Sequence, residues 1–122
     1  MPAFSAEYAQ TLKQGLEAYA DQDFEQAVAL LSKGMQMAPK ANQSVPFLYI
    51  GTSLLRAGLV GDGVRALNLL LERDSLVCGA HRELYLYEAK AGDLAKAAIH
   101  RRWLKKLCPW SLPHLDSVLA AP

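Results

Sequence analysis

Residue types that can hold a metal ion lie in the C-terminal third of the chain. Cys78 and His81 form a Cys-x-x-His motif, and Cys108 and His114 follow further along. Zinc sites are built from such thiolate and imidazole ligands. The second pair, however, lacks the spacing of a zinc knuckle. Both cysteines also fall where helices are expected to begin or end, which are ordinary places for small buried residues. We therefore predict no metal and no cofactor.

The sequence gives little support to catalysis. The three histidines, His81, His100 and His114, have no neighbouring Ser or Asp arranged as a nucleophile with its base. The run Gly58-Leu-Val-Gly-Asp-Gly lacks the Gly-Lys-Ser/Thr ending of a phosphate-binding loop. We therefore predict that the chain is not an enzyme.

A basic stripe occurs in the stretch 100–106, where cationic side chains flank a tryptophan. Its members are His100, Arg101, Arg102, Lys105 and Lys106, with Trp103 and Trp110 nearby. Basic residues interleaved with aromatic ones can bind nucleic acid. The formal net charge of the chain is only +1, however, and nucleic-acid binding relies on a strong positive balance. Nucleic-acid binding is therefore a minor alternative to a solvated helix face.

The apolar residues that must position these groups recur at helical spacing. They predict helices over about 6–20, 24–38, 44–57, 60–73, 78–91 and 94–107, and a short capping helix over 112–120. Ser5 and Ser44 are predicted to cap the first and third helices, and the break at 21–23 to cap the second. Four leucines in the stretch 67–71 make the fourth helix almost wholly apolar, so we expect it to be central. No run alternates with period two, so no sheet is predicted.

The predicted helix pairs recur along the chain. Gly58 and Gly92 mark the same turn between helices, 34 residues apart, and Gln22 holds the matching place 36 residues before Gly58. A period near 34 with two helices per period is typical of a helix-turn-helix solenoid. An ordinary up-down bundle is the alternative, and it requires the recurrence to be a coincidence.

Small residues and prolines recur with the same period and carry a family resemblance. The small residues are Gly15, Ala27, Gly51, Gly63 and Ala97, and the prolines are Pro39 and Pro109. Over about residues 8–109 the chain resembles the tetratricopeptide repeat family, although Tyr85 and Ser75 depart from its pattern. The resemblance implies an all-α solenoid with repeats at 8–41, 44–77 and 78–111 and a cap at 112–120. With 122 residues of ordinary globular composition, we expect one domain over 1–122.

In this family the first helix of each repeat lines an inner groove through its second, fifth, ninth, twelfth and thirteenth positions. Carried onto this chain, that rule predicts groove residues Leu12, Leu16, Tyr19, Leu48, Tyr49, Thr52, Leu55, Arg56, Arg82, Leu86 and Lys90. A carboxylate-binding clamp of Lys and Asn is not expected, because Leu12 and Leu16 stand in those places. The predicted groove is instead apolar, with Arg56, Arg82 and Lys90 toward one side. We therefore expect a non-catalytic module that binds a helix or extended segment of a partner protein, either apolar or apolar and acidic.

Three interpretations of the function differ in what occupies the groove. The leading one is an adaptor, assembly factor or secretion-type chaperone; the alternative is a scaffold whose repeats stack between subunits. A third possibility is that the chain's own final helix or N-terminus fills the groove. The N-terminal residues lack a secretory signal, no stretch is apolar enough to cross a bilayer, and two cysteines are too few for a disulfide scaffold. We therefore predict a cytoplasmic protein with no membrane insertion.

Overall fold

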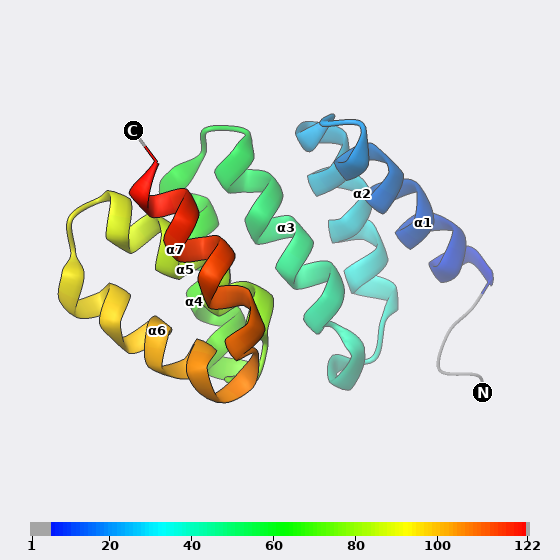
Figure 1. Ribbon diagram of the computed structural model, residues 1–122. Helices are drawn as coiled ribbons and strands as arrows, with labels where there is room; N and C mark the ends of the chain where they lie inside the picture. The colour runs from blue at the N-terminus through cyan, green and yellow to red at the C-terminus, as the bar shows by residue number, and fades with distance from the viewer. Residues whose placement is uncertain (1–5, 122) are drawn as a thin grey trace. The chain divides into compact units, whose positions relative to one another are not determined.

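A computed structural model describes residues 6–121 of the chain, and their backbone is helical almost throughout (Figure 1). The helices are α1 (Ala6–Ala20), α2 (Phe24–Met37), α3 (Ser44–Arg56), α4 (Val60–Arg73), α5 (Cys78–Lys90), α6 (Leu94–Leu107) and α7 (Leu112–Ala120). The short 3-10 helices η1 (Lys40–Asn42) and η2 (Pro109–Ser111) precede α3 and α7. No strand occurs in residues 6–121, so the all-α prediction is confirmed. The predicted cap at Ser5 lies outside the described residues.

The chain divides into two compact units, unit 1 up to Asp74 and unit 2 from Ser75. In unit 1, α1 packs on α2, α2 on α3, and α3 on α4. Between the first three helices lies a cluster of buried apolar side chains that includes Ala27, Leu31 and Ile50. Leu31 is fully buried, and burying one leucine completely contributes about 1.5–3 kcal/mol to folding. The apolar stripes of these helices therefore hold unit 1 together.

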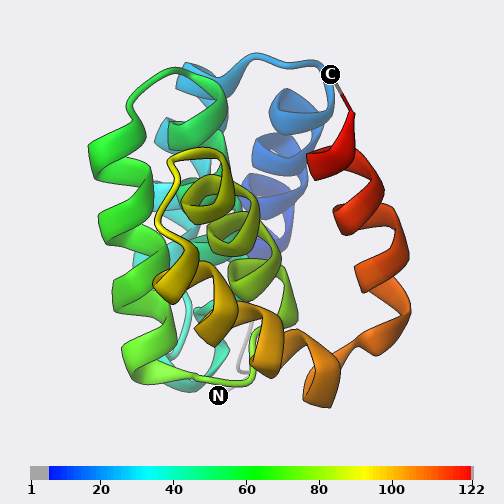
Figure 2. The ribbon, with the colours of Figure 1, turned by 60° about the vertical axis from the view of Figure 1, so that its left-hand side comes forward.

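Unit 2 is built on the pair α5 and α6, and its C-terminal segment packs against this pair. The chain turns at η2, and α7 runs back alongside (Figures 1 and 2). The buried cluster joins Leu104 of α6 to Leu112 and Leu115 of α7. None of the helices between residues 6 and 121 combines the length and apolar character needed to cross a bilayer.

Three turns between paired helices share one backbone conformation. Gln22, Gly58 and Gly92 have positive φ angles of 63°, 87° and 83°. In each turn the next amide donates to the carbonyl five residues earlier, at 2.9 Å. This hydrogen bond and a left-handed residue define the Schellman ending of a helix. The matching places predicted from the recurrence therefore adopt matching structures, including the one occupied by glutamine instead of glycine.

Close helix contacts occur at several of the predicted small positions, and those at Gly15 and Gly51 are equivalent. A Cβ added at Gly15 would lie 2.8 Å from the side chain of Leu31, and one at Gly51 would lie 2.7 Å from that of Leu67. These pairs are equivalent, because 36 residues separate both the glycines and the leucines. The absence of a side chain at the glycine is what lets the leucine approach the partner helix.

The start of α3 differs from the prediction. Ser44 is the first residue of the helix and not its cap, and no side chain caps this end. The hydroxyl of Ser44 instead donates to Oδ2 of Asp74 at 3.3 Å. The preceding Gln43 donates from Nε2 to the carbonyls of Met35 and Ala38, at 3.0 and 3.2 Å. Both polar side chains thus form hydrogen bonds with other segments of the chain, and the local sequence could not indicate these partners.

The expectation that α4 is apolar all round is also wrong. Leu67 and Leu70 are buried, but the side chain of Leu69 is 44% exposed. On the exposed side Arg65 pairs with Asp62 at 3.1 Å. The helix is therefore amphipathic, with one face buried and one solvated.

The two cysteines are joined to each other. A disulfide links Cys78 at the start of α5 to Cys108 just after α6, across a Cα–Cα distance of 6.4 Å. The interpretation of these residues as separate buried thiols is therefore wrong. Disulfides persist mainly in oxidising compartments, so the cysteine content no longer argues for the cytoplasm. The cytoplasmic location stays a prediction.

Candidate binding surfaces

An open groove with a volume of about 930 Å³ lies in unit 1 along α1. Its lining comes from one face of α1, from η1, from the start of α3 and from the residue after α4. The lining residues are Tyr8, Ala9, Leu12, Lys13, Leu16, Glu17, Ala20, Ala41, Asn42, Ser44, Val45 and Asp74. Spacings of three or four residues along α1 place Ala9, Leu12, Leu16 and Ala20 in one stripe. The groove therefore has an apolar floor that follows the helix.

The chemistry of the groove is apolar in the middle and polar at the edges. Leu12 and Leu16 pack partly against the core cluster of unit 1 and are half-buried, whereas Val45 is 54% exposed. On the outer edge Lys13 and Glu17 approach to 3.9 Å, with both side chains well exposed. Exposed pairs of this kind contribute little to stability. The groove therefore suits an apolar ligand whose rim contacts are polar.

Only some of the predicted groove residues line the observed groove of unit 1. Leu12 and Leu16 line it. Tyr19 and Arg56 instead line another recess of unit 1, of about 400 Å³. The ring of Tyr19 also contacts that of Tyr49 edge to face, with centroids 5.0 Å apart. Tyr49 packs against the core cluster and is half-buried.

Three more predicted residues of α3 lie away from the groove. Leu55 faces α4, since a Cβ at Gly63 would lie 2.8 Å from its Cγ. Thr52 is buried, and Leu48 is half-buried. Neither of these two lines the 930 Å³ groove. Leu55 thus fills the space left open by a glycine on the neighbouring helix.

The predicted groove residues of unit 2 lie on α5. Arg82 and Lys90 are exposed. Leu86 is half-buried and packs against the cluster that contains Leu112 and Leu115 of α7. Within unit 2 the final helix therefore covers part of the predicted inner face, as the third interpretation of the sequence allowed.

Ala9 and Val45 line the groove but are missing from the predicted set. Both stand at the second position of their repeats, which the family rule assigns to the groove, so the sequence carried a signal for them. Tyr8 and Asp74 had no such signal. Asp74 reaches this place through its hydrogen bond to Ser44, which bridges 30 residues of sequence.

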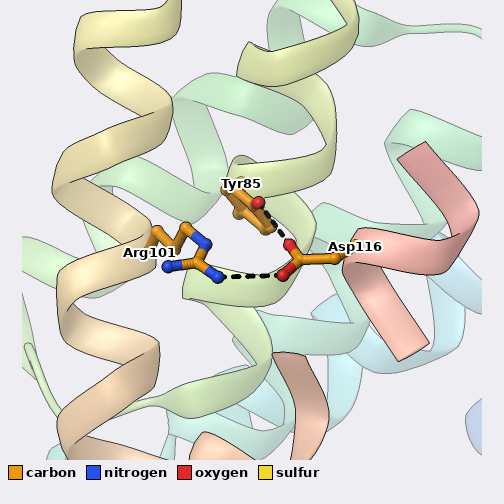
Figure 3. Close-up of polar contacts among 3 residues, drawn as sticks. All are labelled: Tyr85, Arg101 and Asp116. Atoms are coloured by element: carbon orange, nitrogen blue, oxygen red, sulfur yellow. Dashed lines mark hydrogen bonds and ion pairs between the residues drawn. The ribbon is translucent and has the colours of Figure 1, made fainter. Parts of the chain in front are cut away.

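A polar contact fastens α7 to the rest of unit 2 (Figure 3). Tyr85 of α5 donates from its hydroxyl to Oδ1 of Asp116 at 2.6 Å, and Arg101 of α6 donates to Oδ2 at 2.9 Å. The hydrogen bond from Arg101, followed by that from Tyr85, lowers the pKa of Asp116. Burial is the first cause that raises the pKa of Tyr85. The departure from glycine at position 85 thus has a structural reason, because the tyrosine reaches α7.

The only buried histidine among the described residues makes a structural contact. His81 is 2% exposed, and its Nε2 lies 2.8 Å from the carbonyl oxygen of Ser75, to which it must donate. Neutral His81 then accepts at Nδ1 from Nδ1 of His100, 3.0 Å away. Burial, followed by the repulsion of His81, lowers the pKa of His100 to about 4. Both rings are therefore neutral at pH 7.

The residues with metal-ligand chemistry do not come together. Cys78 and Cys108 are bonded to each other in the disulfide. Both ring nitrogens of His81 form hydrogen bonds, one with Ser75 and one with His100. Among residues 6–121 no three His, Cys, Asp or Glu side chains are grouped so that they could hold a metal ion.

The predicted basic stripe lies along α6 and is only partly free. Arg101 is paired with Asp116 at 2.9 Å. Arg102, Lys105 and Lys106 are exposed.

Comparison with protein-family models, with curated proteins and with solved structures finds no match to this chain.

Proposed function

We propose that this chain is a tetratricopeptide-like repeat module that binds an apolar helix of a partner protein in the groove of unit 1 and catalyses no reaction. Within this proposal, α1 to α6 form three repeats and α7 caps the third. The three matching turns and the two equivalent glycine–leucine contacts support the repeat assignment. The single observation that carries the binding role is the apolar groove along α1.

The shape of the groove favours a helical ligand. From Ala9 to Ala20 the stripe spans eleven residue steps, or roughly 16 Å at 1.5 Å per step. A partner helix of about three turns matches this length, with apolar residues at i, i+3 or i+4, and i+7 facing the stripe. Asn42, Lys13 and Glu17 at the edges then meet the polar sides of that helix. Such a module would act as an adaptor, an assembly factor or a chaperone for an apolar segment.

The proposal is tested with peptides selected for binding to the whole chain from a display library of random helices. Selected peptides should carry the i, i+3 or i+4, i+7 apolar pattern. The double variant Ala9→Glu, Val45→Asp puts two charges on exposed groove residues and should weaken their binding by about tenfold or more, as expected when charge is forced against an apolar ligand. Titration calorimetry measures the change.

Leu69→Asp is the control, because Leu69, like Val45, is an exposed apolar residue of unit 1 but does not line the groove. It should leave the dissociation constant unchanged. Equal binding by the groove variant and the wild type would refute the proposal. Concentration-dependent dimers that disappear in the groove variant would show that a second copy of the chain occupies the groove instead.

A further inference from the structure

Helix α6 presents a long exposed face with two chemically different halves. In the first half Leu94 and Ile99 are 72% and 46% exposed. In the second half Arg102, Lys105 and Lys106 are exposed. The sequence of α6 contains no acidic residue. The face therefore changes along the helix axis from apolar to cationic.

Arg102 and Lys106, two of the three cations in the second half, form no ion pair with the described residues. Lys96 approaches Asp93 to 3.8 Å and Arg101 pairs with Asp116, but no carboxylate of the described residues lies within ion-pair distance of Arg102 or Lys106. The ammonium of Lys106 lies 5.9 Å from the centre of the Trp103 ring. A recess of about 280 Å³ lies where the halves meet, lined by Ile99, Arg102, Trp103 and Lys106. The recess is therefore bordered both by apolar side chains and by the positive charges of Arg102 and Lys106.

From this arrangement we propose that the exposed face of α6 binds a protein segment that is apolar at one end and acidic at the other. The apolar end lies on Leu94 and Ile99, and the carboxylates lie beside Arg102 and Lys106. An apolar side chain between the two ends fills the recess. The charge of the segment complements that of the face, which sets its orientation. This surface belongs to unit 2 and does not depend on the proposed function of the groove in unit 1.

The order of residues along α6 distinguishes this ligand from a membrane or a nucleic acid. Helices that lie on membranes bury an apolar face along their length and keep Lys and Arg at its sides. Here the cations replace the apolar residues on the same face, so a flat membrane contact would press Arg102 toward the lipid. A nucleic acid would leave Leu94 and Ile99 without apolar contacts. A protein segment with one apolar end and one acidic end matches the chemistry of both halves of the α6 face.

Tryptophan fluorescence reports on unit 2, the unit that carries this surface. The chain has two tryptophans, both in unit 2: Trp103 lines the recess, and Trp110 is 76% exposed. The probe is a synthetic helical peptide of the length of α6, 14 residues, with leucines in one half and glutamates in the other. It should shift the tryptophan emission of the full chain in a saturable titration. A peptide with lysine in place of each glutamate should bind at least about tenfold more weakly.

Charge exchange provides the decisive control. The variant Arg102→Glu, Lys106→Glu should lose about tenfold or more in affinity for the glutamate peptide and should gain affinity for the lysine peptide. Lys33→Glu, Lys40→Glu makes the same charge change at exposed positions of unit 1 and should bind as the wild type does. Parallel titrations use anionic phosphatidylglycerol vesicles and a single-stranded oligonucleotide. No saturable response to the glutamate peptide, equal response of both charge variants, or tighter binding of vesicles or oligonucleotide would overturn the proposal.

Discussion

At the scale of single residues, the His81–His100 contact is the feature with the clearest dependence on pH. Both rings are neutral at pH 7, and burial is the first cause that lowers each pKa. Trp103 stacks on His81, with ring centroids 5.1 Å apart and an angle of 16° between the planes. Protonation of the pair therefore affects both the stability of unit 2 and its fluorescence.

Unit 2 should lose stability as the pH falls from about 6.5 toward 4. In this range the unfolded chain binds a proton at His100 and the folded chain does not, so acid favours unfolding. The part of this loss that comes from His100 levels off below pH 4, where folded His100 is also protonated. At 1.36 kcal/mol per pKa unit, it amounts to no more than about 3 kcal/mol, because His100 is only partly buried.

Denaturant unfolding followed by tryptophan fluorescence at several pH values measures this dependence. His100→Gln is the control, because an amide can still donate to Nδ1 of His81 but does not titrate. The variant should show the smaller loss between pH 6.5 and 4. Identical pH profiles for the variant and the wild type would contradict the lowered pKa.

At the scale of helices, the close approach of α3 and α4 depends on missing side chains. A Cβ at Gly63 would lie 2.8 Å from the side chain of Leu55 and 2.9 Å from its backbone nitrogen. A backbone atom cannot rotate away as a side chain can, so the helices would have to separate. Gly61, two residues earlier in α4, has nothing within 4 Å of an added Cβ.

These two glycines of one helix should respond to alanine in opposite ways. Gly63→Ala should destabilise unit 1 by about 1–3 kcal/mol through overpacking. Gly61→Ala should stabilise it by up to about 1 kcal/mol, because alanine is the better helix former. Urea unfolding followed by circular dichroism gives both values, and equal effects of the two substitutions would show that the helix contact is looser than described.

The disulfide should account for much of the stability of unit 2. It closes a loop of 30 residues between the ends of α5 and α6, and the chain-entropy estimate for such a loop is about 3–4 kcal/mol. Cys108 also belongs to the cluster that holds α7, so the double variant Cys78→Ser, Cys108→Ser should loosen that helix as well. Fluorescence-monitored unfolding with and without dithiothreitol tests this. A midpoint insensitive to the reductant would contradict it.

Much of this helical architecture was predictable, because the features that determine it are local. Apolar periodicity and the breaks at Gly58, Gly92 and Pro39 marked the helices closely. Two of the errors came from contacts between residues distant in sequence. Ser44 turns to Asp74, and Cys78 bonds to Cys108, each 30 residues away. These pairings exist only in the folded chain.

The binding surface was less predictable for a related reason. The family rule found Leu12 and Leu16, which the structure places in the groove. It also selected Leu55, whose side chain instead packs between α3 and α4, in the space that the missing side chain of Gly63 leaves open. Position in a repeat gives the face of a helix. It does not give the size of the neighbouring side chain, which decides whether a residue is exposed there.

At the scale of the whole molecule, the two units offer different surfaces. Unit 1 has an apolar groove with a polar rim, and unit 2 has a face that is apolar at one end and cationic at the other. Unit 2 covers part of its own predicted inner face with α7. We therefore propose that the groove of unit 1, and not the inner face of unit 2, is the place where another protein binds.

Site-specific photo-crosslinking in the cells that produce the protein would show what occupies the groove. Benzoylphenylalanine would replace Val45 in the groove or, as the control, Leu69 on the exposed face of α4. We expect a discrete crosslinked product with another protein from position 45. This product should be absent from position 69 and should be abolished by adding Ala9→Glu. Equal products from both positions, or crosslinks from position 45 only to a second copy of the chain, would contradict it.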